Sequence, residues 1–195
     1  ELNACRVIKI DMEEPRTLQE ACKGISSIIH LAGMNAQDCL LNPEKALLVN
    51  ELGTLNLLKA AKDCKVGQFL YFSTAHVYGS PLCGDFDENF IPKPVHPYSI
   101  SHRLAEDYVI ESAAAGEITS FVFRLSNGIG RPLSKEVNCW SLVANDLCRK
   151  VVSQGHLELN SNPLIQRDFI SIHEINFFLD GTIINSANRI IYLNN

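Results

Sequence analysis

The sequence has little that would direct it to a membrane or a nucleic acid. Its apolar runs are no longer than a strand, whereas a membrane-spanning helix needs about 20 apolar residues. No secretory signal pattern is visible. The Lys and Arg residues form no cluster and the net charge is −5, so a nucleic-acid or membrane-surface partner has little support. We therefore expect a cytoplasmic protein that binds no nucleic acid and no membrane.

Metal-site and disulfide patterns are also missing. The seven cysteines have wide, irregular spacings, with no Cys-x-x-Cys pair and no Cys/His set at zinc-ligand spacing. We predict no metal site, and reduced, buried thiols in a cytosolic protein. Ser73 and His76 are neighbours, but no Gly-x-Ser-x-Gly turn surrounds them, which argues against a serine hydrolase.

What the chain does contain is an alternation of strand-like and helix-like segments. Its 195 residues are 46% apolar and 20% charged, as in a globular domain of ordinary size. The patterns predict strands over 7–12, 26–31, 68–73, 119–125, 157–159, 169–172 and 190–193. They predict helices over 15–23, 43–64, 98–115, 140–152 and 173–184. Such alternation predicts an α/β fold with a doubly wound parallel sheet.

The chain changes character after Pro132, so we expect one domain over 1–132 and a smaller lobe over 133–195, interleaved with the last sheet elements. Chemically useful residues follow successive strands: Asp11, Leu31-Ala32-Gly33, Ser73-Thr74 and Ser126-Asn127. Open α/β sheets bind ligands at the carboxyl ends of their strands. Each feature also has a simple structural explanation, namely a helix N-cap, a turn glycine or an ordinary strand end.

Seven short motifs in order make the pattern specific. They are Asp11-Met12, His30 to Gly33, Asn50 to Leu58, Phe72 to Gly79, Pro97 to His102, Arg124 to Pro132, and Arg167 to Ile170. Together they resemble the extended short-chain dehydrogenase/reductases, the NAD-dependent epimerase/dehydratase family of nucleotide-sugar enzymes. The resemblance implies a Rossmann fold with part of a C-terminal substrate lobe, NAD or NADP as cofactor, and a nucleotide-sugar substrate. Epimerase or ketoreductase chemistry is the activity that it implies.

The resemblance also implies roles for individual residues. Asp11 would accept a hydrogen bond from the adenine, and Asn50 would steady the neighbouring loops. Thr74 would bind the reacting sugar oxygen. Tyr98 would be the general acid/base. Asn127 and Arg167 would contact the substrate pyrophosphate. The full set that it assigns to cofactor binding is Asp11, Met12, Leu31, Ala32, Gly33, Asn50, Ser73, Tyr98 and His102.

The Tyr98 site has a physical requirement that His102 meets poorly. A free tyrosine has a pKa of about 10, too high for a base near neutrality. A cation at i+4, about 4 Å away, would lower that pKa by about three units at an effective dielectric near 20. The family pattern has Lys at the position of His102. An unshifted histidine is only about one-quarter charged at pH 7, so we predict weakened or absent turnover, or turnover that declines as His102 deprotonates. The alternative is that His102 is a surface residue of the helix.

Two further departures bear on function. Ala75-His76 stands where the dehydratases of the family have an Asp-Glu pair, which disfavours dehydration. No Gly-rich phosphate turn opens the chain, and Gly128-Ile129-Gly130 does not supply one because Pro132 follows. Aligned on the family, Glu1 falls just before the third strand, so loss of the central first strand would separate 7–12 from 28–31.

Either the natural polypeptide is longer, or the sheet of a short protein is rearranged; a mass near 21.7 kDa would exclude the first reading. We expect this segment alone to bind NAD(P) poorly. Besides an active enzyme, the sequence leaves open a non-catalytic relative that binds cofactor or protein, and an inactive fragment. The apolar faces of the helices that carry Asn50 and Tyr98 would permit a homodimer.

Overall fold

The computed structural model describes residues 7–132, 134, 136, 140, 142–157, 164–184 and 189–193. The chain divides into two compact units. The first is Glu1–Arg124 with Asn185–Tyr192, and the second is Leu125–Ile184 with Leu193–Asn195. The predicted roles of the two segments, a cofactor domain over 1–132 and a substrate lobe over 133–195, stay a prediction.

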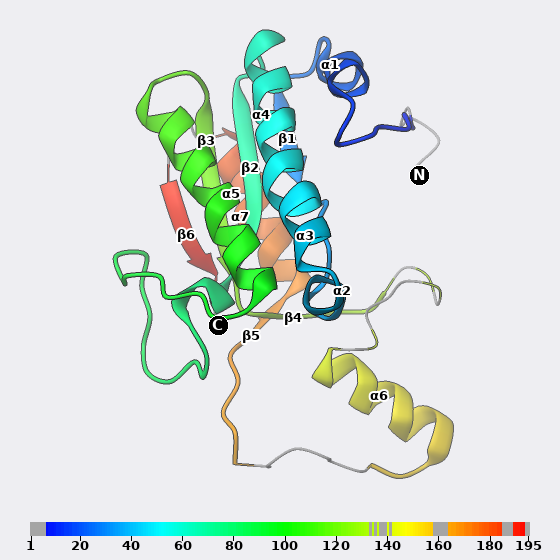
Figure 1. The fold of residues 1–195 in the computed structure, drawn as a ribbon. Coiled ribbons are helices and arrows are strands. Elements are labelled where there is room, and N and C mark those ends of the chain that lie inside the picture. Colours follow the sequence, from blue (N-terminus) through cyan, green and yellow to red (C-terminus); the bar gives the residue numbers. More distant parts are fainter. Residues whose placement is uncertain are drawn as a thin grey trace. The chain divides into compact units, whose positions relative to one another are not determined.

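The first unit contains a four-stranded sheet with the strand order β1-β2-β3-β6 (Figure 1). The strands are β1 (Ser27–His30), β2 (Gln68–Thr74), β3 (Thr119–Leu125) and β6 (Arg189–Leu193). β1 and β2 run parallel, with Ser27 opposite Gln68 and His30 opposite Tyr71. Their carboxyl ends therefore meet at one edge of the sheet, where β2 ends with Ser73 and Thr74.

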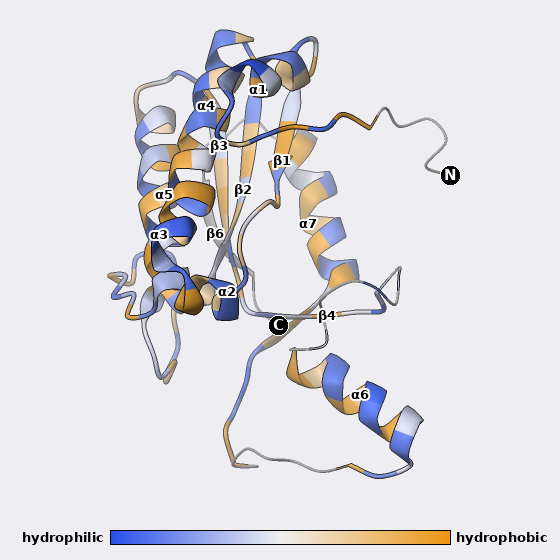
Figure 2. Ribbon diagram, turned by 45° about the vertical axis from the view of Figure 1, so that its right-hand side comes forward, coloured by the Kyte–Doolittle hydropathy of each residue, from blue (hydrophilic) through white to orange (hydrophobic). Residues whose placement is uncertain are grey.

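Helices α1 (Pro15–Cys22), α4 (Gly53–Asp63) and α5 (Pro97–Ala114) pack with these strands. Figure 2 shows that each helix combines apolar and polar residues, as expected for elements with one buried face. The apolar side chains form one core with Phe69 of β2, which is fully buried. Leu18, Ala61 and Val109 represent α1, α4 and α5 in that core, and each is also fully buried.

The helical stretch predicted over 43–64 is interrupted. It consists of α3 (Pro43–Ala46), a π-helical turn η2 (Leu47–Leu52) and α4, and it is preceded by α2 (Ala36–Leu41), which the sequence pattern did not predict. Asn42 starts α3, since its side chain accepts a hydrogen bond from the Lys45 amide at 3.0 Å. The wide turn contains Asn50, and π turns within helices often occur at functional sites.

The strand predicted over 7–12 is wrong. Residues 7–11 belong to no strand, and the Val7 side chain is 94% exposed. A strand needs a hydrogen-bonding neighbour, and no described segment pairs with these residues. The chain instead turns at Asp11, whose side chain accepts a hydrogen bond from the Glu13 amide at 2.9 Å.

Helix α5 begins one residue earlier than predicted because His96 and Ser99 cap it reciprocally. The His96 ring accepts a hydrogen bond from the Tyr98 amide at 3.2 Å, and the Ser99 hydroxyl accepts one from the His96 amide at 3.3 Å. Pro97 suits the first turn, where an amide hydrogen is not needed. These contacts fix Tyr98 in the first turn of α5, close to the end of β2.

The second unit contains a two-stranded parallel ladder and two helices. β4 (Asn127–Ile129), which the pattern did not predict, pairs with β5 (Phe169–Ser171), and Asn127 lies opposite Phe169. The helices are α6 (Val143–Gln154) and α7 (Ile172–Ile184). Residues 158–159 of the strand predicted over 157–159 lie outside the described residues. Among the described helices, none has the length and apolar character needed to cross a membrane.

Candidate active site

Thr74 and Tyr98 meet at the carboxyl edge of the sheet. Thr74 is the last residue of β2 and is 5% exposed. Its side chain caps the short 3-10 helix η3 (Ala75–Tyr78) by accepting a hydrogen bond from the His76 amide. Burial raises the pKa of Tyr98 above its ordinary value of 10, and nearby Cys39 raises this pKa further. An interaction with the Thr74 side chain acts in the opposite direction. The two hydroxyl groups that the sequence predicts to converge therefore lie close to one another.

His102 lies one helical turn after Tyr98, with its ring edge-on to the Tyr98 ring and the centroids 4.5 Å apart. The side chain is only 7% exposed, so the alternative of a surface histidine is wrong. Its Nδ1 atom is hydrogen-bonded to the Tyr71 hydroxyl at 2.7 Å.

The electrostatics of His102 differ from the expectation of a histidine with an ordinary pKa. Burial, together with nearby His30, lowers the pKa of His102 from 6.5 to about 4. The imidazole is therefore neutral at pH 7 and not about one-quarter charged. No cation at this position favours the Tyr98 phenolate.

Asn50 connects the strand-end loop to α5 from its place in the π turn. Its side-chain oxygen accepts a hydrogen bond from the Met34 amide at 2.7 Å, and its nitrogen donates to the Ser101 hydroxyl at 3.0 Å. Gly33 must be small here, because a Cβ atom on it would lie 3.3 Å from the Asn50 side-chain oxygen. The loop after β1 is thus held against the helix that carries Tyr98.

The predicted cofactor-binding residues of the first unit differ in how far they are exposed. Leu31, Ala32 and Gly33 are exposed where β1 ends. Within the described residues, the Ser73 hydroxyl is buried and has no hydrogen-bond partner. Asp11 is exposed, whereas Met12 packs beside Gly53, where a Cβ atom would approach the Met12 Cβ to 3.1 Å.

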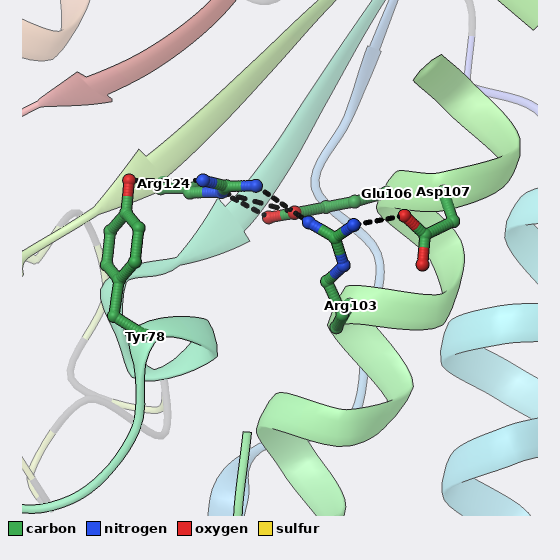
Figure 3. Close-up of polar contacts among 5 residues, drawn as sticks. All are labelled: Tyr78, Arg103, Glu106, Asp107 and Arg124. Atoms are coloured by element: carbon green, nitrogen blue, oxygen red, sulfur yellow. Dashed lines mark hydrogen bonds and ion pairs between the residues drawn. The ribbon is translucent and has the colours of Figure 1, made fainter. Parts of the chain in front are cut away.

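A buried ion pair links β3 to α5, the helix that carries Tyr98 (Figure 3). Arg124 of β3 binds Glu106 of α5 at 2.8 Å, and its Nη1 atom donates to the Tyr78 hydroxyl at 3.1 Å. Arg124 is 1% exposed and Glu106 is fully buried. Since Tyr78 ends η3, which begins directly after Thr74, the pair fixes that segment relative to α5.

Asn127 and Arg167 belong to the second unit. The Asn127 side chain donates a hydrogen bond to the Asp168 carbonyl at 2.8 Å, which places it next to the segment that precedes β5. Arg167 is exposed. The two residues assigned to the substrate pyrophosphate are therefore neighbours within this unit, while their role stays a prediction.

Sequence reasoning missed the buried polar residues behind the site. Tyr71 contacts His102. Thr54 donates a hydrogen bond to the Asn50 carbonyl at 2.5 Å and accepts one from the His30 ring at 2.9 Å. A polar residue within an apolar strand, such as Tyr71 in QFLYFST, was the available signal. Its partner could not be read from the sequence because the two residues are 31 positions apart.

The fold and site define a class, an α/β protein with a threonine at the end of a parallel strand and a tyrosine near it in the first turn of a helix. Residues 1–176 match the model of the NAD dependent epimerase/dehydratase family, and the chain belongs to that family. The predicted fold class is confirmed by solved structures of NAD(P)-binding relatives. A structure of RMD from Pseudomonas aeruginosa complexed with NADPH superposes with a TM-score of 0.82 at 27% identity, covering 97% of this chain and 68% of that chain.

Two curated relatives are similar over most of the chain. The GDP-6-deoxy-D-mannose reductase of Pseudomonas aeruginosa is 31% identical over 178 residues, which cover 86% of this chain and 57% of the relative. The GDP-6-deoxy-D-talose 4-dehydrogenase of Aggregatibacter actinomycetemcomitans is 32% identical over 169 residues, which cover 85% of this chain and 55% of the relative. The chain thus spans a little over half the length of either relative.

Proposed function

We propose that the protein is an NAD(P)-dependent nucleotide-sugar oxidoreductase that works as a ketoreductase, with Tyr98 as general acid. The observation that carries the proposal is the proximity of Tyr98 to Thr74 beside a neutral His102. Membership of the family and the two GDP-sugar relatives support the substrate class.

The protonation state of Tyr98 favours reduction over epimerisation. Reduction of a ketone requires an acid that gives a proton to the carbonyl oxygen, whereas epimerisation begins by removing a proton from a hydroxyl group. The raised pKa keeps Tyr98 protonated at neutral pH, and His102 supplies no charge to change this. Reduction therefore uses the form of Tyr98 that is present, and epimerisation needs the form that is scarce.

NAD(P)H, when bound, supplies the hydride. The exposed backbone at Leu31 to Gly33 would pass beside it, the unpartnered Ser73 hydroxyl would meet it, and Asp11 would accept a hydrogen bond from its adenine. Thr74 would bind the carbonyl oxygen and align it with the Tyr98 hydroxyl. Asn127 and Arg167 would bind the substrate pyrophosphate, for which the planar guanidinium of Arg167 is suited.

A turnover assay tests this function. The protein is mixed with NADPH or NADH and a nucleotide-linked 4-keto-6-deoxyhexose, and oxidation of the cofactor is followed. We expect turnover that falls at least about a hundredfold in Tyr98→Phe, because general acid catalysis contributes that much. Tyr108→Phe, on the same helix but 40% exposed, should retain activity. Equal rates in the two variants would refute the assignment of Tyr98.

A second candidate is a non-catalytic relative, which the neutral imidazole in place of a lysine ammonium favours. Calorimetric titration with NADPH separates the two functions. Binding of NADPH without turnover of any nucleotide-linked ketosugar would support the non-catalytic relative. A homodimer through α5 and the helix that carries Asn50 is compatible with either function.

A further inference from the structure

The inner side of His102 contacts a buried hydrogen-bonded network that the proposed reaction does not use. Nδ1 of His102 lies 2.7 Å from the hydroxyl of Tyr71, a β2 residue that is 1% exposed. The Tyr71 side chain also interacts with nearby Thr54, which acts to lower the pKa of Tyr71. Thr54 is fully buried and must donate to the Asn50 carbonyl, 2.5 Å away, because a carbonyl oxygen can only accept.

Nδ1 of His102 is within hydrogen-bond distance of the Tyr71 hydroxyl, and the Thr54 oxygen lies near the same group. A bare imidazole nitrogen is much more basic than a hydroxyl oxygen, so it is the stronger acceptor. Burial, with Glu106 and Tyr98 nearby, raises the pKa of Tyr71 well above 10, so this phenol keeps its proton at neutral pH. Tyr71 is therefore a permanent donor to Nδ1.

The outer side of His102 faces the candidate site. The Tyr98 ring lies edge-on to the imidazole, and Cε1 of His102 lies 3.9 Å from the Cβ position of Gly33, in the loop assigned to cofactor binding. Within the described part of the chain, Nε2 has no hydrogen-bond partner, and it is not among the fully buried unpartnered atoms. A proton on Nε2 is thus available to a ligand at this edge.

We infer that Tyr71 is a positioning residue that holds His102 as a neutral imidazole with its proton on Nε2, so that His102 offers the bound cofactor a fixed, uncharged N–H donor. The inference rests on the proposed function for the identity of the ligand, but the tautomer is a property of the protein alone. The Tyr71–His102 pair would thus donate the hydrogen bond that the lysine of the family pattern donates, but it would carry no positive charge.

Nitrogen NMR of the protein labelled with ¹⁵N-histidine tests the inference directly. A protonated and a bare imidazole nitrogen have widely separated ¹⁵N shifts, and His102→Gln identifies the His102 signals by their loss. We expect neutral His102 with the proton on Nε2 at pH 7. In Tyr71→Phe the donor is gone, and His102 should show a mixture of both tautomers. Tyr108→Phe, the matched control, should leave the His102 signals unchanged.

A proton on Nδ1 in the unaltered protein overturns the inference, and so does an imidazolium. A tautomer that Tyr71→Phe leaves unchanged overturns it as well. The measurement on the unaltered protein decides the question even where Tyr71→Phe does not fold. Absence of turnover with nucleotide-linked ketosugars would count against the proposed function and leave the tautomer result standing, so the two failures are distinguishable.

Kinetics supply a second readout that loss of packing alone would not produce. Tyr71→Phe should reduce kcat/KM for NADPH roughly fivefold to tenfold, the range expected for one net hydrogen bond. In the His102→Lys background the same substitution should have little effect, because an ammonium group has no tautomer to fix. Equal losses in both backgrounds would show that Tyr71 acts through packing and would overturn the inference.

Discussion

At the residue scale, the imidazole of His102 lies between two phenols, Tyr98 toward the candidate site and Tyr71 beneath it. Its spacing from Tyr98 follows from the helical period and is predictable from the sequence. Its charge is not, because burial at the packed interface of α5 and β2 lowers its pKa, and sequence spacing does not report burial. The same holds for His30, whose pKa burial lowers to about 4.

The two buried histidines predict acid sensitivity. Their folded pKa values, about 4, lie below the ordinary 6.5, so the unfolded chain binds more protons between these values. Stability is thus complete above pH 6.5 and falls as pH decreases toward 4, by about 3 kcal/mol for each histidine. In urea unfolding at pH 7 and pH 4.5, His102→Gln should lose about 2–3 kcal/mol less than the unaltered protein.

The exposed His156 supplies the control for this measurement. His156→Gln should show the same loss of stability between the two pH values as the unaltered protein. If His102→Gln behaves like His156→Gln, His102 is not a buried neutral imidazole.

At the scale of the elements, the Arg124–Glu106 pair links β3, α5 and η3 (Figure 3). Arg124→Met should destabilise the first unit by about 3–5 kcal/mol, because it leaves the fully buried Glu106 carboxylate with less compensation. Arg103→Met removes a partly exposed partner of the same carboxylate and should lose about 1 kcal/mol or less. Urea unfolding of the two variants measures the difference, and equal losses would contradict this role for the buried pair.

In the second unit, Gly130 packs where no larger residue fits. A Cβ atom on Gly130 would lie 2.5 Å from Cγ1 of Ile172, at the start of α7, whereas one on Gly128 meets nothing within 4 Å. Gly130→Ala should therefore reduce the free energy of unfolding by about 1–3 kcal/mol through overpacking. Gly128→Ala should be close to neutral in the same thermal or urea measurement. A neutral Gly130→Ala would mean that the contact with Ile172 is looser than described.

The elements show which sequence patterns suffice. β3 spans the predicted residues because TSFVFRL is rich in β-branched and aromatic residues, and α5 departs from prediction by one residue at either end. The π turn at Leu47–Leu52, which contains the buried Asn50, has no sequence signature. The strand predicted over 7–12 fails because strand formation depends on a partner, which composition cannot reveal.

At the scale of the whole molecule, the order of seven motifs was more informative than any single motif. It predicted the family, and the family model over residues 1–176 confirms it. It also predicted that Thr74 and Tyr98 converge, since strand ends and a following helix meet at one edge of a parallel sheet. Of the polar residues behind them, Thr54 lies within the motif Asn50 to Leu58, whereas Tyr71 lies in none of the seven motifs. The contact between Tyr71 and His102 is visible only in the structure.

The measurement that tests the central claim most directly is the pH dependence of turnover in both directions, for the protein and for His102→Lys. With a neutral His102 and a raised Tyr98 pKa, ketosugar reduction should stay level through neutral pH and decline only as Tyr98 loses its proton above pH 10. Alcohol oxidation should be slow at neutral pH and rise toward that pH, and His102→Lys should move this rise to lower pH because the ammonium favours the phenolate. Oxidation that is already level at neutral pH, with a profile that His102→Lys leaves unchanged, would contradict the account.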